Sequence, residues 1–395
     1  MRFLHSIEEP IPPARRFALW ELGFRPFYLV GSAFAAVSIL LWMLQVTGVL
    51  RSSYLAGPIW HAHEMVFGFA LAVIVGFLFT AGRNWTNQPT PTGRSLAALV
   101  LLWLAARVLV LTPLGWLAAA ANVAFPLVAA ACLAKPFVRA RNRRNYFFVG
   151  LLALLGLASG FIHLAQLEVI TAPAWAGLRI ALDVVLFIVA VMAGRVIPMF
   201  TNNGVRGAGA VRNASVEKAA LGSVLVLLVA DLAGSSGGLL AAVAAAACIA
   251  HSVRWALWRP WRTTAVPLVW VLHLAYCWVP IHLGLRAGAA LGVVAASAAT
   301  HALTVGAIGG LIIGMMTRTA RGHTARPLQA DRFDVACYGL VLLAGVARVL
   351  VPMVWPTTAL VALQASAALW SAGFALYVVR YWPALTRARL DGKPG

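Results

Sequence analysis

The chain has 395 residues, of which 62% are hydrophobic and only 11% are charged, with a mean hydropathy of +0.87. A soluble domain of this composition would expose large apolar patches to water, so the composition excludes that class and predicts an integral membrane protein. The formal net charge is +20, yet the basic residues lie between apolar runs rather than in one patch or arm. Nucleic acid is therefore not an expected partner.

Twelve apolar runs of about 20 residues are each long enough to cross a hydrocarbon core of about 30 Å. Because each segment must satisfy its own backbone hydrogen bonds in a bilayer, the runs predict an all-α polytopic membrane bundle. The expected spans are 27–49, 60–81, 95–112, 115–134, 146–167, 174–199, 217–233, 237–257, 265–285, 290–316, 334–353 and 357–380. Short connections indicate a single transmembrane domain over 1–395, with an N-terminal segment 1–26, which lacks the apolar core of a signal peptide, and a C-terminal tail 383–395.

Positive charge is unequal between the two ends of these spans. When the loops are assigned to alternating sides, 26 of the 31 Lys and Arg residues fall on the side of the N-terminus. The other five are Arg51, Arg107, Arg179, Arg286 and Arg348. The positive-inside rule then predicts that both termini are cytoplasmic.

The second and tenth expected spans resemble each other at an offset of 238 residues. The aligned pairs are His63 with His301, Gly68 with Gly306, Gly76 with Gly314, Arg83 with Arg321, Thr86 with Thr324 and Pro89 with Pro327. Both spans run from outside to inside, so a duplication would give a parallel repeat; chance similarity is an equal alternative. In a true repeat, His63 and His301 would lie at the same depth, as two axial ligands of a haem between helices would.

Six histidines lie in or at the outer ends of apolar spans: His61, His63, His163, His273, His282 and His301. One such histidine more often makes a hydrogen bond at a helix interface, but six favour metal binding. His273 and His282 are nine residues apart and face opposite directions on a helix, so they are not expected to share an ion. His61 and His63 also point apart, so one is expected to bind metal while the other bonds to a carboxylate such as Glu64.

Other polar groups have two interpretations each. Asp183, near the middle of the sixth span, is expected to be protonated, paired with a basic residue, or part of a water-filled path; proton delivery and a structural hydrogen bond are both open. The inner segments 194–203 and 315–324 suit either a quinone head group or helix capping. The four cysteines lie in apolar runs without a CxxCH pattern, so neither disulfides nor covalent haem is expected.

Several motifs together resemble the NnrS family over nearly the whole chain. They are LGFRPF (22–27), WHAHEMVFGF (60–69), RRNYFF (143–148), GRVIPMFTNN (194–203), HALTVGAIGG (301–310) and GHT (322–324). The family is described as twelve-helix bacterial membrane proteins that contain haem and copper and are linked to nitric oxide metabolism and nitrosative stress. The resemblance implies a metal-bearing redox protein of the inner (cytoplasmic) membrane with non-covalent, b-type haem and copper.

The resemblance also suggests roles for residues of this chain. His63 and His301 are expected to bind the cofactor, and the metal ligands are expected among His61, His63, His163, His273 and His301. Glu64 and Asp183 are the candidate catalytic residues. His282 falls outside the matched motifs, and Ala325 stands where the family pattern leads us to expect glycine. Histidines on the second and tenth spans are also similar to the catalytic subunit of haem-copper oxidases and nitric oxide reductases, but the sixth and seventh spans contain no histidine.

Three functions fit these observations. The leading hypothesis is a haem- and copper-binding protein that binds or reduces nitric oxide, with a metal site near the periplasmic side and quinol as electron donor. The second is a twelve-helix secondary transporter in which Asp183 and Arg195 form a coupling pair. The third is a nitric oxide sensor or protective protein without turnover, so enzymatic activity is left open.

Overall fold

The structure, a computed structural model, describes residues 17–50 and 54–393. It is 80% helical and contains no strand in these two ranges. The predicted all-α class is therefore confirmed. Arg51 and residues 1–16 of the expected N-terminal segment lie outside the described residues.

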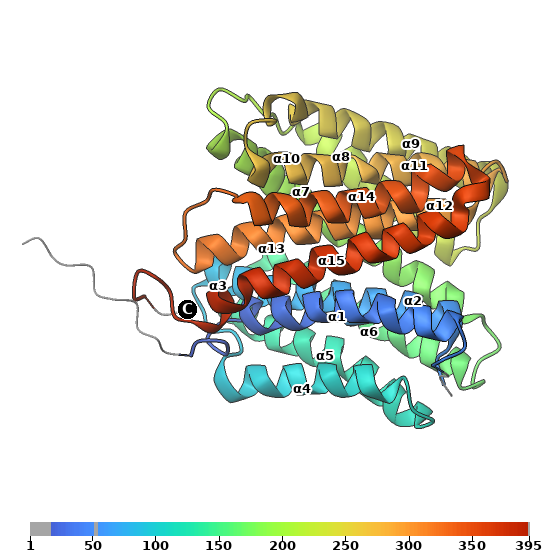
Figure 1. The fold of residues 1–395 in the computed structure, drawn as a ribbon, viewed down its shortest axis with the longest axis horizontal. Coiled ribbons are helices and arrows are strands. Elements are labelled where there is room, and N and C mark those ends of the chain that lie inside the picture. Colours follow the sequence, from blue (N-terminus) through green and yellow to red (C-terminus); the bar gives the residue numbers. More distant parts are fainter. Residues whose placement is uncertain (1–16, 51–53, 394–395) are drawn as a thin grey trace, which may run out of the picture.

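Twelve helical rods run back and forth along one direction (Figure 1). Three of them join several elements, namely α2–η1–α3, α10–α11 and α12–η4–α13. The elements are α1 (Phe24–Val46), α2 (Gly57–His63), η1 (Glu64–Ala70), α3 (Leu71–Thr86), α4 (Gly93–Leu109), α5 (Gly115–Arg139), η2 (Arg143–Asn145), α6 (Tyr146–Gln166), α7 (Ala174–Gly204), α8 (Ala214–Leu232), α9 (Gly237–Leu257), η3 (Pro260–Arg262), α10 (Pro267–Tyr276), α11 (Trp278–Ala290), α12 (Ala296–His301), η4 (Ala302–Gly309), α13 (Gly310–His323), α14 (Arg332–Val354), η5 (Pro356–Thr358) and α15 (Ala359–Thr386). Ten rods in the described part of the chain are long and apolar enough to span a bilayer, so this is a multi-pass membrane protein.

Several helix ends carry the residues that helix chemistry requires. Pro58 and Pro267 stand in the first turns of α2 and α10, where proline removes no helical hydrogen bond. Asp331 forms a capping box with Asp334 at the start of α14. α15 continues to Thr386, a few residues into the segment expected to be a tail.

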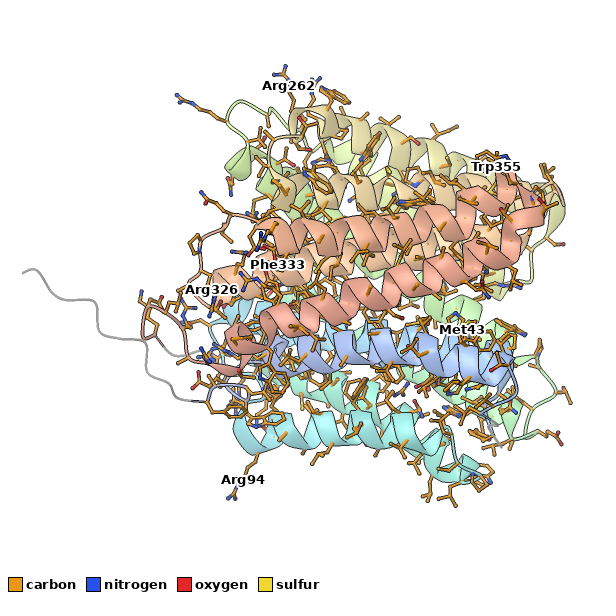
Figure 2. All side chains as sticks on the ribbon, in the orientation of Figure 1. Met43, Arg94, Arg262, Arg326, Phe333 and Trp355 are labelled. Carbon is orange, nitrogen blue, oxygen red and sulfur yellow. The ribbon has the colours of Figure 1, made fainter. Side chains whose placement is uncertain are left out.

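Both ends of the described chain lie at the same end of the bundle. The backbone N–H of Ala18 donates to the carbonyl of Thr386 at 2.8 Å. We call this the inner end, and we call the opposite end, where α2 and α12 begin, the outer end (Figure 1). Figure 2 shows Arg94 and Arg262 toward the inner end and Trp355 toward the outer end.

Two π-helical segments interrupt the rods that resemble each other in sequence. η1 follows His63 and η4 follows His301, so the offset of 238 residues places one π segment on the other. A Cβ atom on Gly68 would lie 2.3 Å from Phe34, and one on the equivalent Gly306 would lie 2.4 Å from Trp278. The shared backbone distortion and the shared close approach of an aromatic ring support a repeat. Because π segments frequently occur at functional sites, they direct attention to the outer end.

The helices that surround the outer ends of these rods come from distant parts of the sequence. α2 contacts α1 and α7, while α12 contacts α11 and α14. α15 in turn packs against both α1 and α14, with α1 and α15 side by side in Figure 1. This arrangement brings the beginnings of α2, α7 and α12 together with the end of α14.

Candidate functional site

His61 on α2 and His301 at the end of α12 face each other at the outer end. Their ring centroids are 6.5 Å apart, and the ring planes differ by only 12°. Both rings line a cavity of about 660 Å³, within the range of about 300–1,000 Å³ that small-molecule and cofactor sites occupy. The two rods with π segments therefore deliver one imidazole each to the same cavity.

Each of these two rings is held in place by its surroundings. Nδ1 of His301 lies 2.7 Å from the carbonyl of Ser297, to which it donates. The ring of His61 stacks on Trp42, with 5.1 Å between centroids. Nδ1 of His61 is buried and has no hydrogen-bond partner among the described residues. This pattern, ordered imidazoles with spare ring nitrogens, suits metal ligation.

The remaining wall of the cavity is mostly apolar, with two arginines. Ile39, Met65, Phe69, Ile308 and Trp370 are among the apolar residues. Arg179 and Arg348 supply positive charge, and none of the described lining residues is acidic. The cavity therefore suits a ligand with a large apolar body and anionic groups.

The geometry fits the haem that the sequence resemblance implies. His61 and His301 would hold its iron: their rings share one cavity with 6.5 Å between centroids, and the buried Nδ1 of His61 has no hydrogen-bond partner among the described residues. The sequence hypothesis paired His63 with His301, but the structure places His61 opposite His301. The reason is helical phase, because His61 and His63 project from different faces of α2.

His63 meets His163 of α6 instead, in a buried second cluster. Their ring centroids are 5.0 Å apart, with the rings at 76°. Nδ1 of His63 donates to Glu64 Oε1 at 2.8 Å, and Nδ1 of His163 lies 2.9 Å from the Tyr54 hydroxyl. The Nε2 atoms of both histidines are buried without a hydrogen-bond partner among the described residues. Two neighbouring imidazoles thus each have one spare nitrogen and one nitrogen that is held.

This second cluster extends into a buried ion pair. Arg107 of α4 donates to Glu64 Oε1 at 2.5 Å and also bonds to Asn122 of α5. Imidazole suits copper, so His63 and His163 provide two fitting ligands. The described residues contain no group of three or more His, Cys, Asp or Glu side chains placed to hold one ion.

A second cavity, of about 220 Å³, adjoins the first and shares four lining residues with it. Asp183 and Asp231 line it, and both accept hydrogen bonds from Arg286, which lies 2.7 Å from Asp183 Oδ1. The expected coupling of Asp183 with Arg195 is wrong: Arg195 donates instead to Asn145 at 2.7 Å. Arg286 of α11 reaches Asp183 of α7 across 103 positions of sequence, a contact that only the tertiary fold creates.

His282 and His273 lie apart from the two histidine pairs. His282 lines the second cavity and its Nδ1 donates to the carbonyl of Ala299 at 2.7 Å. His273 bonds through Nε2 to the hydroxyl of Thr201 at 2.8 Å. Neither ring contacts His61, His63 or His301 among the described ring contacts.

The polar groups of the inner segment 194–203 are used within the protein. A Cβ atom on Gly194 would lie 1.9 Å from Nη2 of Arg254, which pairs with Glu217 at 2.7 Å. The Asn202 side chain makes two hydrogen bonds with the backbone of Ala210. These contacts match the capping and packing alternative for this segment.

Sequence reasoning missed three contributors to the site, namely Tyr54, Arg107 and Arg286. Tyr54 lies in a short connection and carries no pattern that indicates a role. Arg107 and Arg286 were read only as charges on the outer side, although an arginine within an apolar run usually has a buried partner. That position within the run was the available signal.

The family comparison bears on this site. The model of the NnrS protein family matches residues 18–389, nearly the whole described chain. The chain belongs to the NnrS family. Membership supports a nitric-oxide-related membrane protein. A comparison with curated proteins found no match.

Proposed function

We propose that this NnrS family member is a haem- and copper-binding protein of the bacterial inner membrane that binds or reduces nitric oxide. Its metal site would lie near the periplasmic side, with both termini in the cytoplasm. The observation that carries the proposal is the pair of parallel imidazoles, His61 and His301, 6.5 Å apart in a cavity of about 660 Å³. Haem iron held in this way supplies one-electron transfer.

The neighbouring pair, His63 and His163, is the proposed place for copper. Its support is the two buried Nε2 atoms that have no hydrogen-bond partner among the described residues. Glu64 and Arg107 hold His63, while Tyr54 holds His163, which keeps both rings in fixed orientations. His61 and His63 lie two residues apart on α2, so one short helix serves both proposed metals.

Reduction of nitric oxide needs electrons and protons in balance. Two nitric oxide molecules and one quinol give nitrous oxide, water and quinone, so the quinol supplies both electrons and both protons. Glu64 and Asp183 are the proposed proton-holding groups. Each has one buried carboxylate oxygen without a hydrogen-bond partner among the described residues, and Asp183 lines the cavity that adjoins the haem cavity.

Optical and metal analysis of the purified protein tests the proposal. We expect one haem per chain with the Soret band of a low-spin, two-imidazole complex, and we expect His61→Ala and His301→Ala to lose haem or convert it to a high-spin form. His273→Ala is the matched control, because His273 is a buried histidine that does not line the cavity. Unaltered protein without Soret absorbance, or both cavity variants with the unaltered spectrum, would overturn the proposal.

The same purified proteins distinguish the proposed function from its alternatives. Anaerobic consumption of nitric oxide with a quinol donor distinguishes a reductase from a sensor or protective protein. Flux of a substrate into proteoliposomes that survives His61→Ala and His301→Ala would instead indicate a transporter.

A further inference from the structure

The arginines at the outer end differ in whether they have an acidic partner. Arg107 pairs with Glu64, and Arg286 pairs with Asp183 and Asp231. Arg179 and Arg348 pair with no acidic side chain among the described residues. Arg348 is partly buried, where a cation without an acidic partner is costly, whereas Arg179 is exposed.

Arg179 and Arg348 approach one cavity from two different helices. Arg179 lies near the beginning of α7 and Arg348 near the end of α14, so both are at the outer end of the bundle. Both line the cavity that contains His61 and His301. Among the described residues that line this cavity none is acidic. Arg179 also lines the adjoining cavity beside Asp183 and Asp231, but both of those carboxylates pair with Arg286. The guanidinium groups of Arg179 and Arg348 are therefore available to an anionic ligand.

The distribution of polarity along the cavity defines the chemistry of that ligand. The deeper wall includes Phe69, Ile308 and Trp370, which suit a flat apolar body. The arginines supply guanidinium groups, which bind carboxylates through paired charge-assisted hydrogen bonds. An apolar macrocycle with carboxylates along one edge meets both requirements.

We propose that Arg179 and Arg348 bind the two propionate carboxylates of the haem, with the propionate edge turned toward the outer end. This inference rests on the proposed function. It gives a binding role to two arginines whose charge otherwise bears only on topology, and it assigns the orientation of the cofactor within the cavity.

Arg348 is also a positioning residue for His301. It donates to Ser297 Oγ at 3.1 Å, and Ser297 holds His301 through its carbonyl at 2.7 Å from Nδ1. A propionate bound to Arg348 would therefore be linked through one serine to the imidazole that binds the iron. Loss of the arginine is expected to lower the haem reduction potential, because a nearby positive charge favours the reduced state, as well as to weaken binding.

The test compares haem with its dimethyl ester, which keeps the macrocycle and iron but lacks both carboxylates. Haem-depleted protein in detergent is titrated with each compound, and the Soret change reports binding. We expect unaltered protein to bind haem at least tenfold more tightly than the ester, since hydrogen bonds to charged groups contribute about 1.5–3 kcal/mol each. Equal affinities would overturn the proposal, and this comparison requires no variant to fold.

Substitution of the two arginines tests whether they cause the preference for haem over its dimethyl ester. Arg179→Gln with Arg348→Gln should bring the two affinities within about twofold. Arg179→Gln alone should leave ester affinity unchanged, because only Arg348 also positions His301. Arg94→Gln, an exposed arginine at the inner end, should behave as unaltered protein. A preference that survives the double substitution would overturn the proposal.

Palmitate at the haem concentration should not compete; displacement of haem by palmitate would assign the arginines to a lipid carboxylate instead. Absence of any Soret change with either compound would contradict the proposed function itself, not merely the role of the arginines.

Discussion

At the scale of single residues, Arg254 shows how this protein stabilises a charge in its interior. Arg254 is 1% exposed and makes two hydrogen bonds to Glu217, at 2.8 and 2.7 Å, and one to the Tyr276 hydroxyl. Gly194 lacks a side chain because one would overlap this guanidinium. The glycine that begins the segment 194–203, which suggested a ligand site, is thus explained by the space that the buried ion pair of Arg254 and Glu217 requires.

We predict that Arg254→Met destabilises the fold by about 3–5 kcal/mol, because it leaves the carboxylate of Glu217 buried without its main partner. The free energy of unfolding is measured by titration from mild detergent into sodium dodecyl sulfate. Arg212→Met is the matched control, since Arg212 also pairs with Glu217 but is about half exposed, at 3.5 Å; its expected effect is within about 1 kcal/mol. Equal effects of the two substitutions would contradict the prediction, and Arg254→Met combined with Glu217→Gln should recover part of the loss.

At the scale of elements, the π segments η1 and η4 directly follow the helices α2 and α12 that carry His61, His63 and His301. Each π segment rotates the side chains at the outer end of its rod relative to those of the α-helix that follows, which is α3 after η1 and α13 after η4. η4 lies against α11 and α14, where Gly306 contacts Trp278 closely. The expected pairing of His63 with His301 came from the aligned repeat, which does not report how each rod is rotated toward its neighbours; in the structure His61 is the histidine near His301.

Gly306→Ala should destabilise the protein by about 1–3 kcal/mol, because the added Cβ would lie 2.4 Å from a ring atom of the buried Trp278. Thermal unfolding in detergent, followed by circular dichroism, measures the change. Gly339→Ala on α14 is the control, since nothing lies within 4 Å of its new Cβ; it is expected to be neutral or stabilising by up to about 1 kcal/mol. Equal stability of the Gly306 variant and the unaltered protein would show that the ring can move aside.

At the scale of the whole molecule, the unequal charge of the two ends has a structural basis. Of the four outer-side arginines that the structure describes, Arg107 and Arg286 pair with buried acids, and Arg179 and Arg348 line the cavity. None of the four serves simply as a loop charge. The positive charge that sets orientation is therefore more one-sided than counting along the sequence suggests.

We expect reporter fusions to place the inner end in the cytoplasm. Green fluorescent protein joined after Gly395 or after Arg141 should fluoresce, and alkaline phosphatase joined after Thr112 or Leu291 should be active, because the positive-inside rule keeps the Arg-rich loops in the cytoplasm. Each reporter at the opposite set of sites is the control. The reverse pattern at all four sites would invert the orientation and move the metal site to the cytoplasmic side.

The sequence was sufficient to predict the fold class and the approximate positions of the helices. It predicted only part of the candidate site. Long apolar runs allow one solution in a bilayer, so the helices followed from composition and length. The histidines of the site were also recognised, because few imidazoles occur in such runs. Their partners were not: His61 with His301, and His63 with His163, depend on how distant helices rotate against each other.

What the sequence determined by itself is local or set by solvent: the helical backbone, the multi-pass class, and the side that carries positive charge. Twelve spans were expected, and ten helices among the described residues are long and apolar enough to cross a bilayer. The tertiary structure decided which side chains meet. It placed Arg286 rather than Arg195 against Asp183, and it turned His61 rather than His63 toward the cavity. The physical reason is that contacts between helices depend on how each helix is rotated about its axis and on the π segments. Residue spacing along one regular helix contains no information about either.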